Sequence, residues 1–79
     1  MITFKTKTAE GRGWTKTWHD IYRNGADTGF TAFEQNDKTL SVERDDRHYG
    51  NFATLDQVTA WVAKQPLGFG EKLSAKGII

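Results

Sequence analysis

Hydrophobic and polar residues alternate over most of the first 44 positions, which is typical of strands in a sheet with one buried face. Four strands are predicted, at residues 2–8, 15–23, 28–35 and 39–44. Asn24-Gly25 and Asn36-Asp37-Lys38 are typical turn sequences between them, because Asn, Asp and Gly tolerate positive φ angles. Residues 9–13 are predicted to form a loop. The pattern therefore predicts an antiparallel β-meander.

The period changes from two to about 3.6 after Thr54. Thr54 and Gln57 have the spacing of a capping box, in which two side chains satisfy free amide groups at a helix start. Apolar residues then fall on one helical stripe, at Leu55, Val58, Trp61 and Val62. Pro66 cannot continue the helical hydrogen bonds, so the helix is expected to end near Gln65.

The remaining segments complete the expected fold. Residues 45–51 are polar and are predicted to connect the last strand to the helix, and residues 71–76 are predicted to form a short second helix. The expected class is α+β, a single domain over residues 1–79. It consists of a four-stranded antiparallel β-meander with one C-terminal helix, or two, packed on one face.

Such a helix covers only one face of the sheet, so the other face meets solvent or a partner. Strand alternation assigns an inner set to the core, namely Ile2, Phe4, Ile21, Phe33, Leu40 and Val42. The outer set is Lys5, Lys7, Lys16, Trp18, Asp20, Tyr22, Phe30, Ala32, Glu34, Ser41 and Glu43. Aromatic side chains beside acids on a solvent face are typical of a contact surface. The predicted partner-binding residues are Trp18, Asp20, Tyr22, Phe30 and Glu34.

An alternative register exists for the strand at residues 15–23. A shift of one residue would turn every side chain of that strand to the other face and would place Trp18 and Tyr22 in the core.

Composition limits the classes of function. The chain has no cysteine, and His19 and His48 lie on different elements without the spacing of metal ligands, so neither a metal nor a cofactor is expected. No apolar run is long enough for a membrane span or a signal peptide, so no membrane partner and a cytoplasmic location are expected. Eleven Lys and Arg against ten Asp and Glu give a net charge of +1, which argues against direct nucleic-acid binding.

Short motifs do not indicate catalysis. Gly11-Arg12-Gly13 and Gly68-Phe69-Gly70 are interpreted as loop sequences, since the second lacks the strand and helix start of a pyrophosphate site. Residues 45–48, Asp-Asp-Arg-His, are interpreted as a solvated run of charges. His19 and Asp20 are adjacent on a strand, so their side chains point to opposite faces. No nucleophile, base and oxyanion donors are recognisable together, so the chain is not expected to be an enzyme.

Several segments carry a resemblance to a known family. Tyr22-Arg23-Asn24-Gly25 ends the second strand, Phe33-Glu34 lies on the next, and Gly68-Phe69-Gly70 follows the helix. Helix residues that match in type and spacing are Thr54, Asp56, Gln57, Trp61 and Pro66. Over residues 18–71 the chain resembles the small α+β anti-CRISPR proteins that phages make against type I systems. It differs in having Lys5-Thr6-Lys7-Thr8 where the family has a tyrosine, and in having Trp18 and Phe30.

The resemblance implies a non-enzymatic inhibitor in the cytoplasm of a bacterial host. It would dock on a Cas protein, the repeated backbone subunit of the crRNA-guided type I surveillance complex, and block target DNA from pairing with the guide. Tyr22 and Glu34 match positions that the family uses for this contact.

Two alternatives of different class remain. In the first, Trp18, Tyr22 and Phe30 stack the bases of a single-stranded nucleic acid, and Lys5, Lys7 and Lys16 follow its phosphates. In the second, two copies of the chain bury the outer face in a homodimer.

Overall fold

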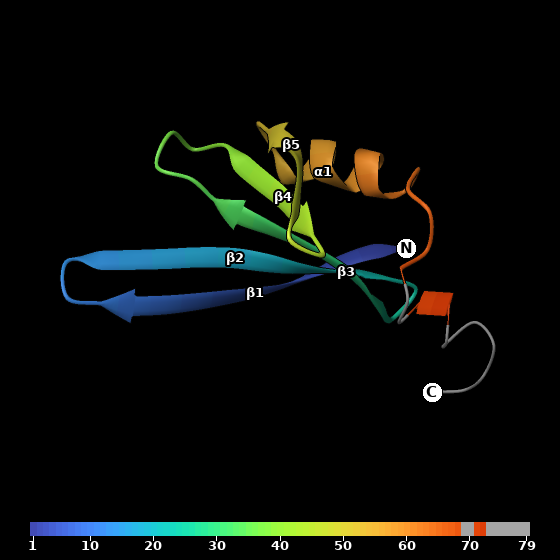
Figure 1. The fold of residues 1–79 in the computed structure, drawn as a ribbon, viewed down its shortest axis with the longest axis horizontal. Coiled ribbons are helices and arrows are strands. Elements are labelled where there is room, and N and C mark those ends of the chain that lie inside the picture. Colours follow the sequence, from blue (N-terminus) through green and yellow to red (C-terminus); the bar gives the residue numbers. More distant parts are fainter. Residues whose placement is uncertain (69–70, 73–79) are drawn as a thin grey trace.

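The computed structural model describes residues 1–68 and 71–72. Five strands form one antiparallel sheet in the order β1-β2-β3-β4-β5, and a helix follows the last strand (Figure 1). The elements are β1 (Ile2–Gly11), β2 (Trp14–Arg23), β3 (Ala26–Glu34), β4 (Leu40–Arg44), β5 (Arg47–Phe52) and α1 (Leu55–Val62). The α+β class and the meander order agree with the prediction, and the sheet has one strand more than predicted.

The additional strand is β5, which lies in the segment predicted as a polar connection. Asp45 and Asp46 have φ angles of 54° and 62° and form the tight turn that returns the chain beside β4. Leu40 pairs with Phe52, and Val42 pairs with Gly50. An edge strand has a neighbour on one side only and buries few side chains, so the alternation that reveals a strand is weak in this segment.

The loop predicted at residues 9–13 is also replaced by strand. β1 continues to Gly11, which pairs with Trp14, and Gly13 makes the turn with a φ angle of 77°. The pairing of β2 with β3 begins only at Trp18. Residues 8–17 therefore form a two-stranded ribbon that projects beyond the rest of the sheet (Figure 1). We call this ribbon the hairpin arm.

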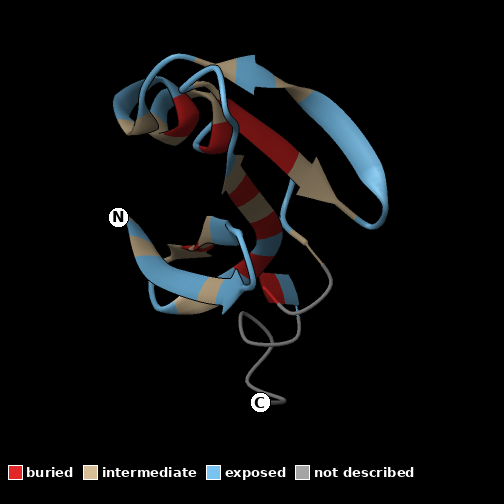
Figure 2. Ribbon diagram, turned by 90° about the vertical axis from the view of Figure 1, so that its left-hand side faces the viewer, coloured by how far each residue is buried: buried red, intermediate tan, exposed pale blue. Residues whose placement is uncertain are grey.

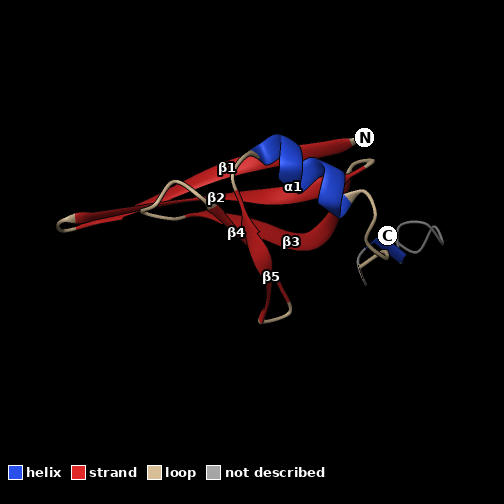
Figure 3. Ribbon diagram, turned by 90° about the horizontal axis from the view of Figure 1, so that it is seen from above, coloured by secondary structure: helices blue, strands red, loops and turns tan. Residues whose placement is uncertain are grey.

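The core lies between α1 and the face of the sheet that α1 covers, which we call the inner face (Figure 2). Its buried apolar residues are Ile21, Phe30, Ala32, Leu40, Val42, Val58 and Val62. The sheet is strongly twisted, and α1 lies on its concave side (Figures 2 and 3). All of these buried sheet residues point inward, so the opposite face, which we call the outer face, is not covered by the helix.

The side chains of β3 that face the core are not the predicted ones. Phe30 is 1% exposed and Ala32 is fully buried, so both lie in the core, whereas Phe33 pairs with Trp18 on the outer face. When both alternating sets of side chains in a strand include apolar residues, alternation alone does not decide which set faces the core. The alternation then places Glu34 on the inner face, where it contacts the buried His19.

A bulge in β3 accommodates the buried Phe30. Asp20 pairs with Thr31 and Tyr22 with Asp27, so Ile21 alone lies opposite the three residues between them. Gly29, at the centre of the bulge, has a φ angle of 80°, which favours glycine. The Thr28 hydroxyl donates to the Ile21 carbonyl at 2.7 Å and accepts from the Phe30 amide at 3.1 Å. The Thr28 hydroxyl thus provides hydrogen-bond partners for two backbone groups at the bulge, the Ile21 carbonyl and the Phe30 amide.

Helix α1 begins as predicted. The Thr54 hydroxyl accepts a hydrogen bond from the Gln57 amide at 3.2 Å, and the Gln57 side-chain oxygen accepts one from the Ala53 amide at 2.9 Å. The helix ends at Val62, about one turn before the expected end near Gln65. Beyond it the backbone at Glu71 and Lys72 is helical, and the rest of the helix predicted at residues 71–76 lies outside the described residues.

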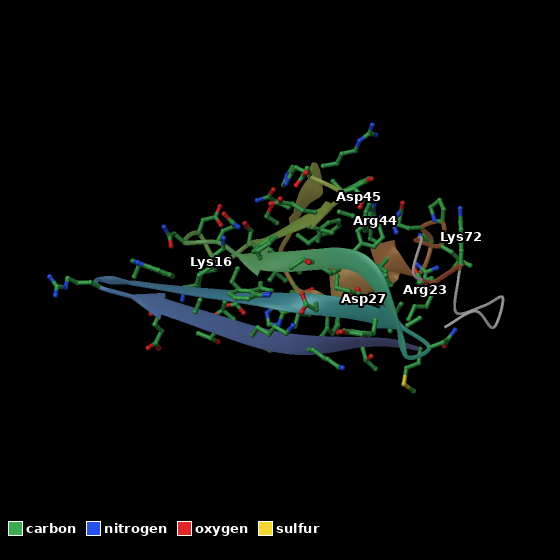
Figure 4. All side chains as sticks on the ribbon, turned by 60° about the horizontal axis from the view of Figure 1, so that its bottom comes forward. Lys16, Arg23, Asp27, Arg44, Asp45 and Lys72 are labelled. Atoms are coloured by element: carbon green, nitrogen blue, oxygen red, sulfur yellow. The ribbon has the colours of Figure 1, made fainter. Side chains whose placement is uncertain are left out.

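Arg23 fastens the C-terminal end of α1 to the sheet (Figure 4). Its guanidinium donates to the carbonyls of Val62 at 2.7 Å and Gln65 at 3.2 Å. The same guanidinium lies 3.3 Å from the carboxylate of Glu71, which is 4% exposed. A cation at this position complements the negative end of the helix dipole.

Candidate partner-binding face

Strand β2 supplies the centre of the outer face. Its even-numbered residues Lys16, Trp18, Asp20 and Tyr22 alternate with the inward-pointing His19 and Ile21. The predicted register of this strand is therefore the observed one, and the alternative that places Trp18 and Tyr22 in the core is not. Both aromatic residues are half-buried by their neighbours on the same face.

Aromatic side chains and lysines interleave on this face. Trp18 lies directly opposite Phe33 of β3, and the Lys16 amine lies 4.8 Å above the centre of the Phe33 ring. Tyr22 is four residues from Trp18, about 13 Å along the strand, and the Lys5 amine lies 4.6 Å above its ring. We call Trp18, Tyr22 and Phe33 the outer aromatic residues. Tyr22 and Phe33 each present a large ring beneath a lysine amine.

An ion pair lies between Trp18 and Tyr22 on the outer face. The Lys7 amine is 2.8 Å from the Asp20 carboxylate. The hydrogen bond with Asp20 and the negative charge of Asp20 raise the pKa of Lys7 above its usual value. Across the face, cations lie on the β1 and β2 side, and the acids Asp27 and Glu43 lie on β3 and β4.

Two hollows flank Phe33 and Glu43 on the outer face. The larger has a volume of about 470 Å³ and is also lined by Thr15, Lys16 and Gln35. The smaller has a volume of about 170 Å³ and extends toward Arg44 and Asp46. Both are open to solvent.

Of the predicted site residues, Trp18, Asp20 and Tyr22 share the outer face, and Phe30 and Glu34 do not. The aromatic residue that β3 supplies to this face is Phe33, three positions after Phe30. The Arg44 guanidinium covers Phe30 with its carbon 3.7 Å from the ring centre. Phe30 has no access to a partner because it is buried.

Glu34 belongs to a second group of polar side chains on the inner face. His19 is 6% exposed, and its Nε2 lies 2.7 Å from a Glu34 oxygen while its Nδ1 lies 2.8 Å from the Thr6 hydroxyl. A neutral imidazole can donate to the carboxylate and accept from the hydroxyl in this geometry. The group joins three strands, and it borders a cavity of about 400 Å³ that reaches Thr54 at the start of α1. We interpret it as structural.

Within the described part of the chain, two exposed aromatic residues were not predicted as site residues. Trp14 is 54% exposed at the end of the hairpin arm, and Tyr49 is 40% exposed on β5 beside Phe30 and Trp61. Both lie in segments that were predicted to be loops or loop ends. Trp14 continues the same even-numbered alternation as Trp18 and Tyr22, and this signal was present in the sequence.

Among residues 1–68 and 71–72, no three His, Asp or Glu side chains lie close enough to hold a metal ion. Within the same residues, no helix has the length and apolar character needed to cross a membrane. Comparisons with protein-family models, with curated proteins and with solved structures find no match to this chain.

Proposed function

We propose that this protein is a non-enzymatic inhibitor that docks the outer face of its sheet on another protein. The observation that carries the proposal is that the aromatic rings of Trp18, Tyr22 and Phe33 lie together at the centre of the face that the helix leaves uncovered. The core is formed on the other face, so Trp18, Tyr22 and Phe33 are not needed to fill it. Tyr and Trp are also common anchors of protein interfaces.

The charges of the outer face favour a defined orientation of the partner. Lys5, Lys7 and Lys16 lie toward one side, and Asp27 and Glu43 lie toward the other. A face with separated charges binds best to a surface with the opposite separation, and this complementarity contributes mainly to specificity and to the rate of association.

The partner that we propose is the repeated backbone subunit of a type I crRNA-guided surveillance complex, on which the protein would block target DNA binding in the bacterial cytoplasm. The support is the resemblance over residues 18–71, together with an outer face that includes Tyr22. The resemblance implies that Glu34 contacts the partner directly. Its carboxylate is instead hydrogen-bonded to His19 on the inner face, so we do not include Glu34 in the proposed contact surface.

The proposal is tested by co-elution of the purified protein with type I surveillance complexes of several subtypes. Tyr22→Ala should weaken binding by about tenfold or more, as loss of an interface anchor does. Tyr49→Ala is the matched control, because it removes the same side chain from a half-exposed position on the inner side of the sheet. Circular dichroism of both variants establishes that they are folded.

Two results would contradict the proposal. If the protein co-elutes with none of the complexes, the proposed partner is wrong. If Tyr22→Ala and Tyr49→Ala weaken binding equally, the outer face is not the binding surface. Light scattering of the free protein would separately reveal a homodimer that buries this face.

A further inference from the structure

The net charge of +1 conceals an uneven distribution along the chain. Residues 1–18 carry four cations, Lys5, Lys7, Arg12 and Lys16, and one acid, Glu10, a net charge of +3. The other 61 residues carry seven Lys or Arg and nine Asp or Glu, a net charge of −2. The cations therefore concentrate on the β1–β2 hairpin, whereas the rest of the molecule is acidic.

The fold places most of these cations on one face of the hairpin. Lys5, Lys7, Ala9 and Gly11 of β1 lie opposite Asp20, Trp18, Lys16 and Trp14 of β2, and all eight point to the outer face. Glu10 pairs with Thr15 and points to the opposite face. Asp20 is an acid on the outer face, and its carboxylate is bonded to Lys7. Lys16 lies on the arm, away from Asp27 and Asp45 (Figure 4), and its amine lies over the Phe33 ring in the hollow that Glu34 and Glu43 also line.

At the end of the arm an exposed tryptophan packs across a glycine. A Cβ atom on Gly11 would lie 2.0 Å from Nε1 of Trp14, so the indole lies directly across the glycine. One face of the indole rests on backbone, while 54% of the residue remains exposed. A planar ring held in this way is ready to stack with another planar group, because little side-chain freedom is lost on binding.

We propose that the hairpin arm binds single-stranded nucleic acid, with a base stacked on Trp14 and phosphates bound by Arg12 and Lys16. Aromatic residues interleaved with cations on an exposed strand face are the usual construction of such sites. A single strand fits better than a duplex because stacking on a side chain requires a base that is not already stacked in a helix. The proposal does not depend on the partner proposed for the centre of the outer face.

The test measures fluorescence anisotropy of labelled oligo(dT) and oligo(U), each about 15 nucleotides long, with the full-length protein in low salt. A duplex of the same length is measured alongside. We expect both single strands to bind more tightly than the duplex, and comparison of the two distinguishes DNA from RNA. Trp14→Ala should weaken binding about tenfold or more, which is the effect of losing one stacked base.

A charge-matched pair of variants separates the arm from the general charge of the protein. Arg12→Ala/Lys16→Ala should weaken binding and reduce the slope of log K against log salt by about 1.4, since each phosphate contact on a single strand contributes about 0.7. Arg47→Ala/Lys64→Ala removes the same charge from exposed positions on β5 and after α1 and should bind as the wild type does. Gly11→Ala, which displaces the indole, should weaken binding without lowering the thermal unfolding temperature.

Three outcomes would overturn the assignment. These are no binding of either single strand, equal losses in the two charge-matched variants, and a Trp14→Ala variant that binds as tightly as the wild type. Tyr49→Ala, on the inner side of the sheet, should leave oligonucleotide binding unchanged. Oligonucleotide binding and co-elution are measured separately, so either proposal can fail without the other. If Trp14→Ala abolishes co-elution with a protein complex while the wild type binds no oligonucleotide, the arm belongs to a protein interface instead.

Discussion

At the scale of single residues, two phenylalanines three positions apart have opposite roles. Phe30 is packed edge to face against Trp61 and Tyr49, with ring centres 5.2 and 5.5 Å apart, and is buried. Phe33 is half-exposed beside Trp18. Their chemistry is the same, so their effects on stability compare the two faces of the sheet directly.

We expect Phe30→Ala to lower the free energy of unfolding by about 3–5 kcal/mol, because it leaves a cavity among the buried aromatic rings. Phe33→Ala should lower it by about 1 kcal/mol or less, as substitutions on an accessible face usually do. Urea denaturation measures both values. Equal losses, or a larger loss for Phe33→Ala, would mean that β3 has the opposite register.

The turn before β4 provides a pH-dependent prediction. The Thr39 hydroxyl and amide both donate to Asp37, at 2.6 and 3.0 Å, and these hydrogen bonds hold the pKa of Asp37 below its usual value of 3.8. A carboxylate whose pKa is lowered by folding stabilises the protein above the unfolded pKa, and this contribution is lost as the pH falls through the folded pKa.

Thr39→Val removes the hydroxyl donor and retains the amide. The pKa of Asp37 should therefore rise toward 3.8, and the unfolding free energy of the variant should fall less steeply than that of the wild type in the acid range below about pH 4. Carboxyl NMR titration of the two proteins measures the change. An unchanged Asp37 titration would show that the hydroxyl does not contribute.

At the scale of elements, helix α1 depends on contacts at both ends. With eight residues it is too short to be stable alone, so its ends and its apolar face must be held by the rest of the protein. Thr54 caps the first turn, and Arg23 of β2 binds the carbonyl of Val62 in the last turn and that of Gln65 beyond it. Glu71 completes this second contact from beyond the helix.

Glu71→Ala should lower the free energy of unfolding by about 3 kcal/mol, because it leaves the largely buried charge of Arg23 without its ionic partner. Replacing both partners, in Arg23→Met/Glu71→Leu, should cost less than the sum of the single variants. A double-mutant cycle by urea denaturation measures this coupling. Strictly additive losses would show that the pair does not contribute to holding the helix.

At the scale of the whole molecule, the sheet and the helix share one small core. The buried apolar residues come from β2, β3, β4 and α1, and the cavity at the start of α1 is bordered by His19 of β2 and Leu40 of β4. Neither the helix nor the sheet has a second core of its own among the described residues. The protein should therefore unfold as a single unit.

Thermal unfolding followed by far-UV circular dichroism and by tryptophan fluorescence should give the same midpoint. The first signal includes α1, and the second includes Trp61 in the core and Trp18 on the outer face. Two distinct midpoints would mean that α1 separates from the sheet before the sheet unfolds.

Much of the architecture was predictable from local sequence. Asn24-Gly25 has φ angles of 51° and 82°, as the turn sequence requires, and Thr54 caps α1 as the capping box predicts. The side of β2 that faces the core was also predicted correctly, because the purely apolar Ile21 alternates with Asp20 and Tyr22, which carry polar groups. The fifth strand and the full length of the first hairpin were missed because both consist mainly of polar residues whose pairing involves the backbone.

The sequence by itself determined the turns at Asn24-Gly25 and at residues 36–38, the order of the first four strands and the start of the helix, since these depend on residues that are close along the chain. Only the tertiary structure decided which face of β3 is buried, because Phe30 and Phe33 are equally apolar and the choice depends on packing against Trp61 and Tyr49. Because this face of β3 is buried, the outer face has Phe33 instead of the predicted Phe30. The Glu34 carboxylate then lies on the inner face, hydrogen-bonded to His19. The candidate site could therefore be located on β2 from sequence, but its β3 half is set by contacts between residues far apart in the chain.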